Sequence, residues 1–269
     1  MNTSIEYTSL VDKDDTVIGI VGGMGPEAGV NLVGAIHKHT KAVKDQDHLS
    51  TILMSFPKHI EDRTAFINGK IVNNPGYEVA KVIEKLENAG AKLIGIACNS
   101  SHSPVIYNVI LDELGKRQSQ VKILNMPFET CKHIKNHHPN ISRVGVISTN
   151  GTYVSGIYDE ILKEMGFEVI KPEYDFQSEV IHEIVYNVDY GLKSKSDEIS
   201  HQINYLMQKA LDFFKNNGAD AVILGCTELA LIPKNFYKTD LLLFDSNELF
   251  AMALIEQAKI LEKMIRPIK

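Results

Sequence analysis

Two cysteines, Cys98 and Cys226, occupy matching positions in two short segments of the chain, 96–100 and 224–228. Each cysteine ends an apolar run and is followed at once by small polar residues. A thiol at the start of a helix faces oriented N–H groups, which lower its pKa from about 8.5 and increase the thiolate fraction. Two such thiols on opposite sides of a carbon atom could remove a proton from one face and return it to the other. The pair therefore predicts two-base chemistry, the kind that racemisation requires.

Other functions of these cysteines remain open. One thiolate could act alone as a nucleophile, as in an amidase, with His102 as the activating base four residues after Cys98. A histidine at that spacing can equally pack against the turn or cap it. A cysteine at a strand end can also serve only as a small buried hydrophobic residue. The third cysteine, Cys131, has no counterpart in the other half of the chain and is expected to be structural.

The two cysteine segments belong to a longer repeat. Segment 18–23 leads to Cys98 and segment 144–149 leads to Cys226, with roughly 80 residues between the matched positions in both cases. Because the segments recur in the same order, the chain is expected to fold as two similar units. We expect one unit to comprise residues 1–125 plus 240–269 and the other to comprise residues 126–239.

The elements that must position the cysteines alternate between strand and helix. Short apolar runs predict strands at 17–21, 51–56, 92–97, 121–124, 143–147, 168–170, 221–224 and 241–244. Near-continuous apolar strands are typical of parallel sheets covered on both faces. Apolar residues at helical spacing lie between them, as in the stripe Tyr205, Met207, Ala210, Leu211 and Phe214. The expected fold is α/β, with two pseudo-symmetric, flavodoxin-like parallel-sheet domains and a site in the cleft between them.

Composition restricts the classes of function. Residues 1–15 lack the pattern of a signal peptide, and no apolar run approaches the ~20 residues of a membrane span. We therefore expect a cytoplasmic protein with reduced thiols and no membrane partner. Three scattered cysteines, without Cys-x-x-Cys or matched histidine spacing, predict neither a disulfide framework nor a metal site. A net charge of −6 with dispersed basic residues argues against nucleic acid as a partner.

A glycine-rich loop after the first strand permits a second interpretation. Gly23, Gly25 and Ala28 fit the spacing of a dinucleotide-binding fingerprint. The second predicted strand, however, ends in Ser-Phe-Pro at 55–57 rather than in the acidic residue that binds a ribose hydroxyl. Pro26 and Glu27 also stand where a pyrophosphate needs open backbone. These features disfavour a nicotinamide enzyme.

Four motifs together resemble the aspartate/glutamate racemase family, in particular its aspartate racemase branch. They are segment 22–26, segment 62–67, the turn at Cys98 and Asn99, and segment 225–228. The resemblance extends from about Val17 to the final helix. It implies a racemase without a cofactor, commonly a homodimer, that acts on a small dicarboxylic amino acid between two similar domains.

The same resemblance implies a role for individual residues. Cys98 and Cys226 would be the catalytic thiols, each serving one enantiomer. The residues implied to bind or enclose the substrate are Met24, Arg63, Asn99, Ser100, Thr149, Lys193, Thr227 and Glu228. Among them, Arg63 and Lys193 would face the side-chain carboxylate, and Glu228 would support the second thiol. Without the resemblance, either cation would be read as a solvated surface charge, although a buried carboxylate needs such a partner.

One departure from the family pattern and several alternatives remain. The usual Cys-Asn-Thr turn has Ser100 in its third position, which keeps the hydroxyl and loses a methyl group. Aspartate and glutamate both carry the second carboxylate, so only the branch resemblance favours aspartate. Related cysteine-based folds racemise hydantoins, isomerise maleate or decarboxylate malonates. A non-catalytic protein that binds an amino acid is a further alternative, although binding alone needs neither thiol.

Overall fold

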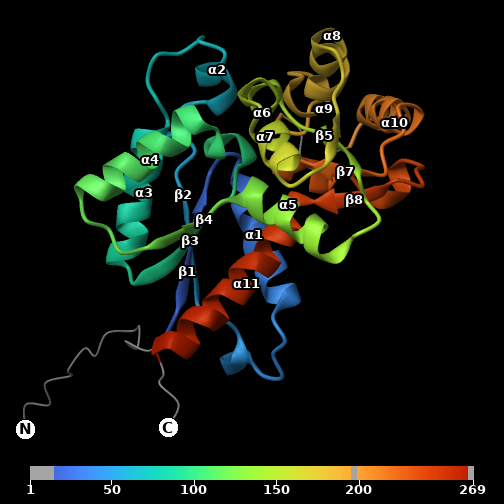
Figure 1. Ribbon diagram of the computed structural model, residues 1–269. Helices are drawn as coiled ribbons and strands as arrows, with labels where there is room; N and C mark the ends of the chain where they lie inside the picture. Colours follow the sequence, from blue (N-terminus) through green and yellow to red (C-terminus); the bar gives the residue numbers. More distant parts are fainter. Residues whose placement is uncertain (1–14, 195–198, 266–269) are drawn as a thin grey trace, which may run out of the picture.

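The computed structural model describes residues 15–194 and 199–265, and within them the strands form two four-stranded parallel sheets (Figure 1). The first sheet contains β1 (Val17–Gly22), β2 (Thr51–Ser55), β3 (Ala91–Ile96) and β4 (Lys122–Leu124) in the order β2-β1-β3-β4. The second contains β5 (Arg143–Ile147), β6 (Glu168–Ile170), β7 (Ala221–Leu224) and β8 (Leu242–Asp245) in the order β6-β5-β7-β8. The two sheets thus share one strand order, which confirms the predicted fold class.

The strands follow closely from the apolar runs in the sequence. Each predicted strand begins and ends within one residue of an observed strand. β1 and β7 are buried at every position, because helices cover both faces of each sheet. A strand buried on two faces has no polar side and is therefore recognisable as a continuous apolar segment.

Helices flank the two sheets throughout the described residues. They are α1 (Pro26–His39), α2 (Arg63–Ile67), α3 (Gly76–Asn88), α4 (Pro104–Lys116), α5 (Met126–His137), α6 (Asn150–Ser155), α7 (Ile157–Glu164), α8 (Tyr174–Phe176), α9 (Glu183–Tyr186), α10 (His201–Asn216) and α11 (Ser246–Ile265). A π-helical segment, Gln177–His182, joins α8 to α9.

The first sheet lies between two helical layers. α1 and α11 lie side by side on one face, where Leu32 and Leu254 pack with Leu93 of β3 (Figure 1). α3 and α4 cover the other face, where Ile83 and Ile106 pack in another apolar cluster. These helices hold β1 and β3 in the middle of the sheet, so the loops that follow these two strands emerge beside each other.

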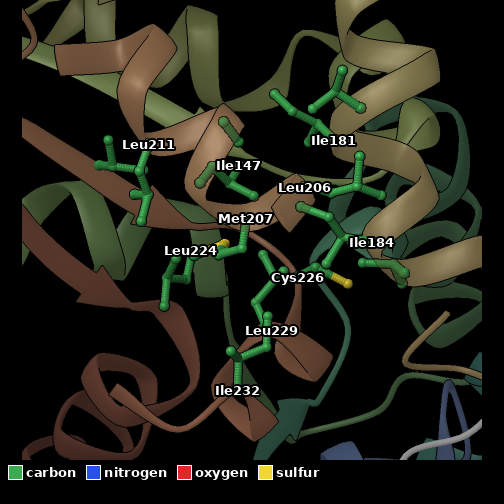
Figure 2. Packing of buried hydrophobic residues seen from close by; sticks show 14 of the residues in the cluster. Ile147, Ile181, Ile184, Leu206, Met207, Leu211, Leu224, Cys226, Leu229 and Ile232 are labelled. Carbon is green, nitrogen blue, oxygen red and sulfur yellow. The ribbon is translucent and has the colours of Figure 1, made fainter. Parts of the chain in front are cut away.

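The second sheet is covered in the same way. α10 packs on one face through Met207 and Leu211, and this cluster extends to Cys226 (Figure 2). Cys131 of α5 is fully buried in the cluster on the opposite face, as its expected structural role requires. Tyr205 was predicted to belong to the buried stripe of α10, but it is 60% exposed. Two residues turn a helix by about 200°, so Tyr205 lies opposite Met207.

The chain crosses between the sheets at α5 and again at α11. α5 follows β4 of the first sheet but packs in the core of the second, whereas α11 follows β8 and packs in the core of the first. β8 pairs with β7, so the return to the first sheet begins at α11. The domain boundaries at 125/126 and 239/240 stay a prediction from the sequence.

Among the described helices, none combines the length and the apolar content that crossing a bilayer requires. The expectation that residues 1–15 are not a signal peptide concerns a segment of which residues 1–14 lie outside the described ranges.

Candidate active site

Both cysteines lie where a central strand ends and a short helical segment begins. Cys98 follows β3 and precedes the 3-10 helix Asn99–His102, whereas Cys226 follows β7 and precedes the 3-10 helix Thr227–Leu231. In parallel sheets, ligand sites form beyond the carboxyl ends of the strands. The two thiols line one small cavity there.

The structure brings every site residue predicted from the sequence to this cavity. Its lining contains all ten of them, namely Met24, Arg63, Cys98, Asn99, Ser100, Thr149, Lys193, Cys226, Thr227 and Glu228. Their catalytic and binding roles stay predictions. Sequence reasoning missed three further lining residues, Thr152, Tyr186 and Gly225. Thr152 lies three residues after Thr149 and is therefore on the same side of the chain at the start of α6, a signal that was available. No comparable sequence signal identifies Tyr186.

An outer cavity lies beside the inner one. Four residues line both cavities: Met24, Arg63, Lys193 and Glu228. The backbone N–H of Gly25 donates to Glu228 Oε1 at 3.1 Å, so the loop after β1 is fastened to the second sheet's unit. The bond also occupies an N–H of the glycine loop that a dinucleotide phosphate would need.

Arg63 is the first residue of α2 and is a buried cation. Its Nη1 donates to the carbonyl oxygen of Glu61 at 3.0 Å and its Nη2 donates to that of Met24 at 3.2 Å. Its buried Nε has no hydrogen-bond partner. Among the described residues, no carboxylate forms an ion pair with this guanidinium. Burial lowers the pKa of Arg63, but the nearby Cys98 opposes this effect and the pKa ends above its ordinary value.

Lys193 differs from Arg63 because a carboxylate already pairs with it. Its Nζ donates to Glu228 Oε1 at 2.5 Å, and the Glu228 side chain is only 5% exposed. Glu228 Oε2 accepts from Cys226 Sγ at 3.0 Å and from Thr227 Oγ1 at 3.2 Å. Burial alone would raise the pKa of Glu228, but Lys193 and these hydrogen bonds lower it to about 2. Glu228 is therefore a carboxylate at neutral pH.

The pKa values of the two thiols are shifted in opposite directions. Burial would raise the pKa of Cys98, but the Arg63 guanidinium and the neighbouring serine hydroxyls bring it below its ordinary value. Burial and the Glu228 carboxylate raise the pKa of Cys226 well above its ordinary value. The sequence had predicted a lowered pKa for both thiols, and for Cys226 that prediction is wrong. With Cys98 as thiolate, two buried negative charges balance Arg63 and Lys193.

His102 does not contact the Cys98 thiol through a hydrogen bond. Its Nδ1 lies 2.9 Å from the Cys98 carbonyl oxygen, and its Nε2 accepts the backbone N–H of Met126 at 3.4 Å. Burial lowers the pKa of His102 to about 4, so the imidazole is neutral at pH 7. The ring fixes the turn after β3, which removes the activating base that the amidase interpretation needs.

Hydrogen bonds within and between the two units shape the remaining walls. The Tyr158 hydroxyl donates to Asn99 Oδ1 at 2.6 Å, and Asn99 Nδ2 donates to Ser246 Oγ at 3.1 Å. The Thr149 hydroxyl lies 3.4 Å from that of Thr64, the residue after Arg63. These bonds hold Asn99 and Thr149 in place at the cavity wall.

The different acidities predict different reactivities of the cysteines. We expect iodoacetamide at neutral pH to modify Cys98 faster than Cys226, because the thiolate is the reactive form and the pKa of Cys98 is the lower one. Peptide mapping by mass spectrometry measures the rate at each site. Cys131, whose pKa is raised by burial, should stay unmodified in the folded protein. Faster modification of Cys226 would contradict the assignment.

The described part of the chain contains no cluster of side chains suited to binding a metal ion. No group of three or more His, Cys, Asp or Glu side chains is arranged there to bind one. The polar groups of the cavity are instead two thiols, two cations, one carboxylate, the Asn99 amide and several hydroxyls. This donor set can hold a small zwitterion with an additional acidic group.

Comparison with known proteins extends these observations. Residues 21–254 match the family described as Asp/Glu/Hydantoin racemase. The chain is 25% identical over 252 residues to the broad specificity amino-acid racemase RacX of Bacillus subtilis (strain 168), covering 89% of this chain and 96% of the relative.

Solved structures with the same fold include enzymes of this kind. The Picrophilus torridus aspartate racemase has 28% identity and a TM-score of 0.70, with 91% of this chain and 94% of that chain covered. Glutamate racemase from Francisella tularensis, in complex with D-glutamate, has 18% identity and a TM-score of 0.64, with 95% and 85% covered. At this identity, the second likeness concerns the fold alone.

Proposed function

The chain belongs to the Asp/Glu/Hydantoin racemase family and is a racemase, and we propose that it interconverts L- and D-aspartate with Cys98 and Cys226 as its acid/base pair. The observation that carries the substrate assignment is the buried Arg63, which lines the same cavity as both thiols and pairs with no described carboxylate. A buried guanidinium of this kind suits a bidentate interaction with the side-chain carboxylate of the substrate.

In the proposed reaction, the Cys98 thiolate removes the α-proton from one enantiomer. The electron pair of the C–H bond remains on the α-carbon and is delocalised into the adjacent carboxylate. Cys226 then donates its thiol proton to the opposite face, and the new C–H bond has the inverted configuration. The proton count is unchanged, and the thiol and thiolate have exchanged places. No cofactor is required for this sequence.

The opposite pKa shifts of the two thiols support this division of roles. General acid/base catalysis of inversion needs one base and one acid in the resting enzyme. Arg63 favours the thiolate of Cys98, whereas the Glu228 carboxylate keeps the proton on Cys226. The reverse reaction starts from the Cys226 thiolate, whose pKa is raised by burial and by Glu228 and lowered by Lys193.

The polar lining supplies partners for the rest of the substrate. We assign Asn99, Ser100, Thr149 and Thr227 to the α-amino and α-carboxylate groups. Arg63 and Lys193 face the side-chain carboxylate in this assignment, and the Met24 loop covers the site. Glu228 supports the Cys226 thiol through its hydrogen bond of 3.0 Å.

The proposal is tested by proton NMR of L-aspartate in heavy water with purified protein and no added cofactor. We expect the α-proton signal to disappear and chiral chromatography to detect D-aspartate. L-Glutamate and neutral amino acids are measured in parallel, because RacX is described as having broad specificity. Equal rates with neutral amino acids would contradict recognition of the side-chain carboxylate. Absence of exchange with every amino acid tested would contradict the proposal that the substrate is an amino acid.

The assembly of the protein is a separate prediction. The family resemblance implies a homodimer. Sedimentation of the purified protein measures the assembly directly.

A further inference from the structure

Tyr186, which sequence reasoning missed, connects the two units of the protein at the active site. It ends α9 in the second sheet's unit, and its hydroxyl donates to Asp62 Oδ2 at 2.8 Å. The other carboxylate oxygen of Asp62 accepts the backbone N–H of Ala65 at 2.7 Å and so caps the N-terminus of α2. Both oxygens of Asp62 therefore fix the segment that begins with Arg63.

α2 needs such contacts to keep its position. It has five residues, and a helix this short is not stable on its own. Across the cleft, α6 contacts α2, and Tyr186 of α9 bonds to Asp62, the residue that caps α2. A Cβ on Gly151 of α6 would lie 2.9 Å from the Thr64 Cα, so the two segments touch through their backbones. The place of the Arg63 guanidinium thus depends on the other unit.

The ring of Tyr186 also faces the second cation of the site. Lys193 Nζ lies 5.6 Å from the ring centroid, within the range of a cation–π contact. On another side the ring stacks on His182, with the centroids 4.5 Å apart. His182 Nδ1 in turn accepts the backbone N–H of Asn150 at 3.2 Å. His182 therefore supports the Tyr186 ring. The same tyrosine bonds to Asp62, which precedes Arg63, and its ring contacts Lys193.

We propose that Tyr186 is a positioning residue for recognition of an acidic side chain. Its hydroxyl, through Asp62, sets where Arg63 stands, and its ring limits where Lys193 can move. The two cations then converge on one carboxylate only when the units are docked through this tyrosine. This inference rests on the proposed function, because it concerns the carboxylate that distinguishes aspartate from a neutral amino acid.

The test is the variant Tyr186→Phe, which keeps the ring and removes the bond to Asp62. We expect the KM for L-aspartate to rise about tenfold, since a hydrogen bond to a charged acceptor that orders the anchor is lost, while kcat changes by less than about threefold. Tyr153→Phe is the matched control, because it removes a hydroxyl bonded at 2.8 Å to the Pro172 carbonyl oxygen, outside the inner cavity. An unchanged KM, or a loss confined to kcat, would overturn the proposal.

A second variant guards against a general loss of structure. Asp62→Asn keeps an oxygen that can cap α2 and changes the acceptor of the phenol. We expect it to raise KM as Tyr186→Phe does, and the double variant to be no worse than either single variant, because all three break one coupled unit. Fully additive effects would show that Tyr186 and Asp62 act independently and would overturn the proposal.

A third readout does not depend on the substrate. The groups that tune Cys98 are Arg63, Lys193 and the hydroxyls of Ser100 and Ser101. If Tyr186→Phe displaces Arg63, the pH profile of iodoacetamide modification at Cys98 shifts to higher pH. An unshifted profile together with an unchanged aspartate KM refutes the role of Tyr186 and leaves the proposed function unaffected. Failure of the wild-type protein to exchange any amino acid refutes the proposed function instead.

Discussion

Replacing either Cys98 or Cys226 by serine is expected to reduce the rate of aspartate racemisation by about 1,000-fold, within the range for loss of a general acid or base. A serine hydroxyl is a far weaker acid than a thiol, so it can neither hold the negative charge of the base nor release a proton readily. Each turnover uses both groups, and both directions of the reaction should therefore be lost in each variant. Chiral chromatography of the reaction mixture measures this loss.

The two serine variants should differ in a partial reaction. A remaining thiolate can still remove and return the α-proton on its own face, which exchanges hydrogen for deuterium without inversion. Cys226→Ser should exchange one enantiomer near neutral pH, because the pKa of Cys98 is lowered. Cys98→Ser should exchange the other enantiomer only at higher pH, because burial and Glu228 raise the pKa of Cys226.

Cys131→Ala is the matched control for the thiol chemistry. Cys131 is fully buried in the apolar core around α5 and does not line the cavity. Its replacement should leave kcat near the wild-type value, although the small cavity it creates lowers stability. Near-wild-type racemisation by Cys98→Ser or Cys226→Ser would remove that cysteine from the mechanism.

Replacing Arg63 by leucine is expected to lower kcat/KM for L-aspartate by about 1,000-fold through two effects. Loss of charge-assisted hydrogen bonds to the substrate carboxylate accounts for roughly 100-fold. Loss of the cation beside Cys98 raises the pKa of that thiol, which lowers the thiolate fraction near neutral pH and accounts for the rest of the decrease. Initial rates and the pH profile of Cys98 modification separate the two effects.

Two further variants define what Arg63 contributes. Arg117→Leu removes a guanidinium that pairs with Glu84, away from the cavity, and should leave activity unchanged. Arg63→Lys keeps a positive charge but cannot reach both carbonyl oxygens and a carboxylate in the same planar arrangement, so activity should be intermediate. A decrease of less than about tenfold in Arg63→Leu would contradict the assigned carboxylate recognition, because loss of one charge-assisted hydrogen bond already costs about that much.

The sequence predicted the sheets because the signal that specifies them is local. Strands buried on both faces appear as apolar runs, and observed strands such as β5, β6 and β7 have the predicted bounds. The repeated segments also placed both cysteines at strand ends, where parallel sheets bind ligands. Tyr205 was misplaced because a list of apolar residues near helical spacing ignores the angle between positions two apart.

The predicted site residues came from short motifs, so they could be named before the fold was known. Tyr186, which was missed, and the contact of Gly25 with Glu228 have a different character. Tyr186 reaches Asp62 across 124 positions of sequence, and the bond from Gly25 to Glu228 spans 203 positions. No local pattern encodes such contacts, since they arise only when two separately formed surfaces meet.

The sequence by itself thus determined the α/β units and the positions of Cys98 and Cys226 at their edges. Only the tertiary structure decided that these two thiols differ in acidity and that Arg63 lies buried without a carboxylate partner among the described residues. The physical reason is that pKa values depend on burial and on charges within a few ångströms. The residues that supply those charges come from both units and converge only when the cleft between the sheets is formed.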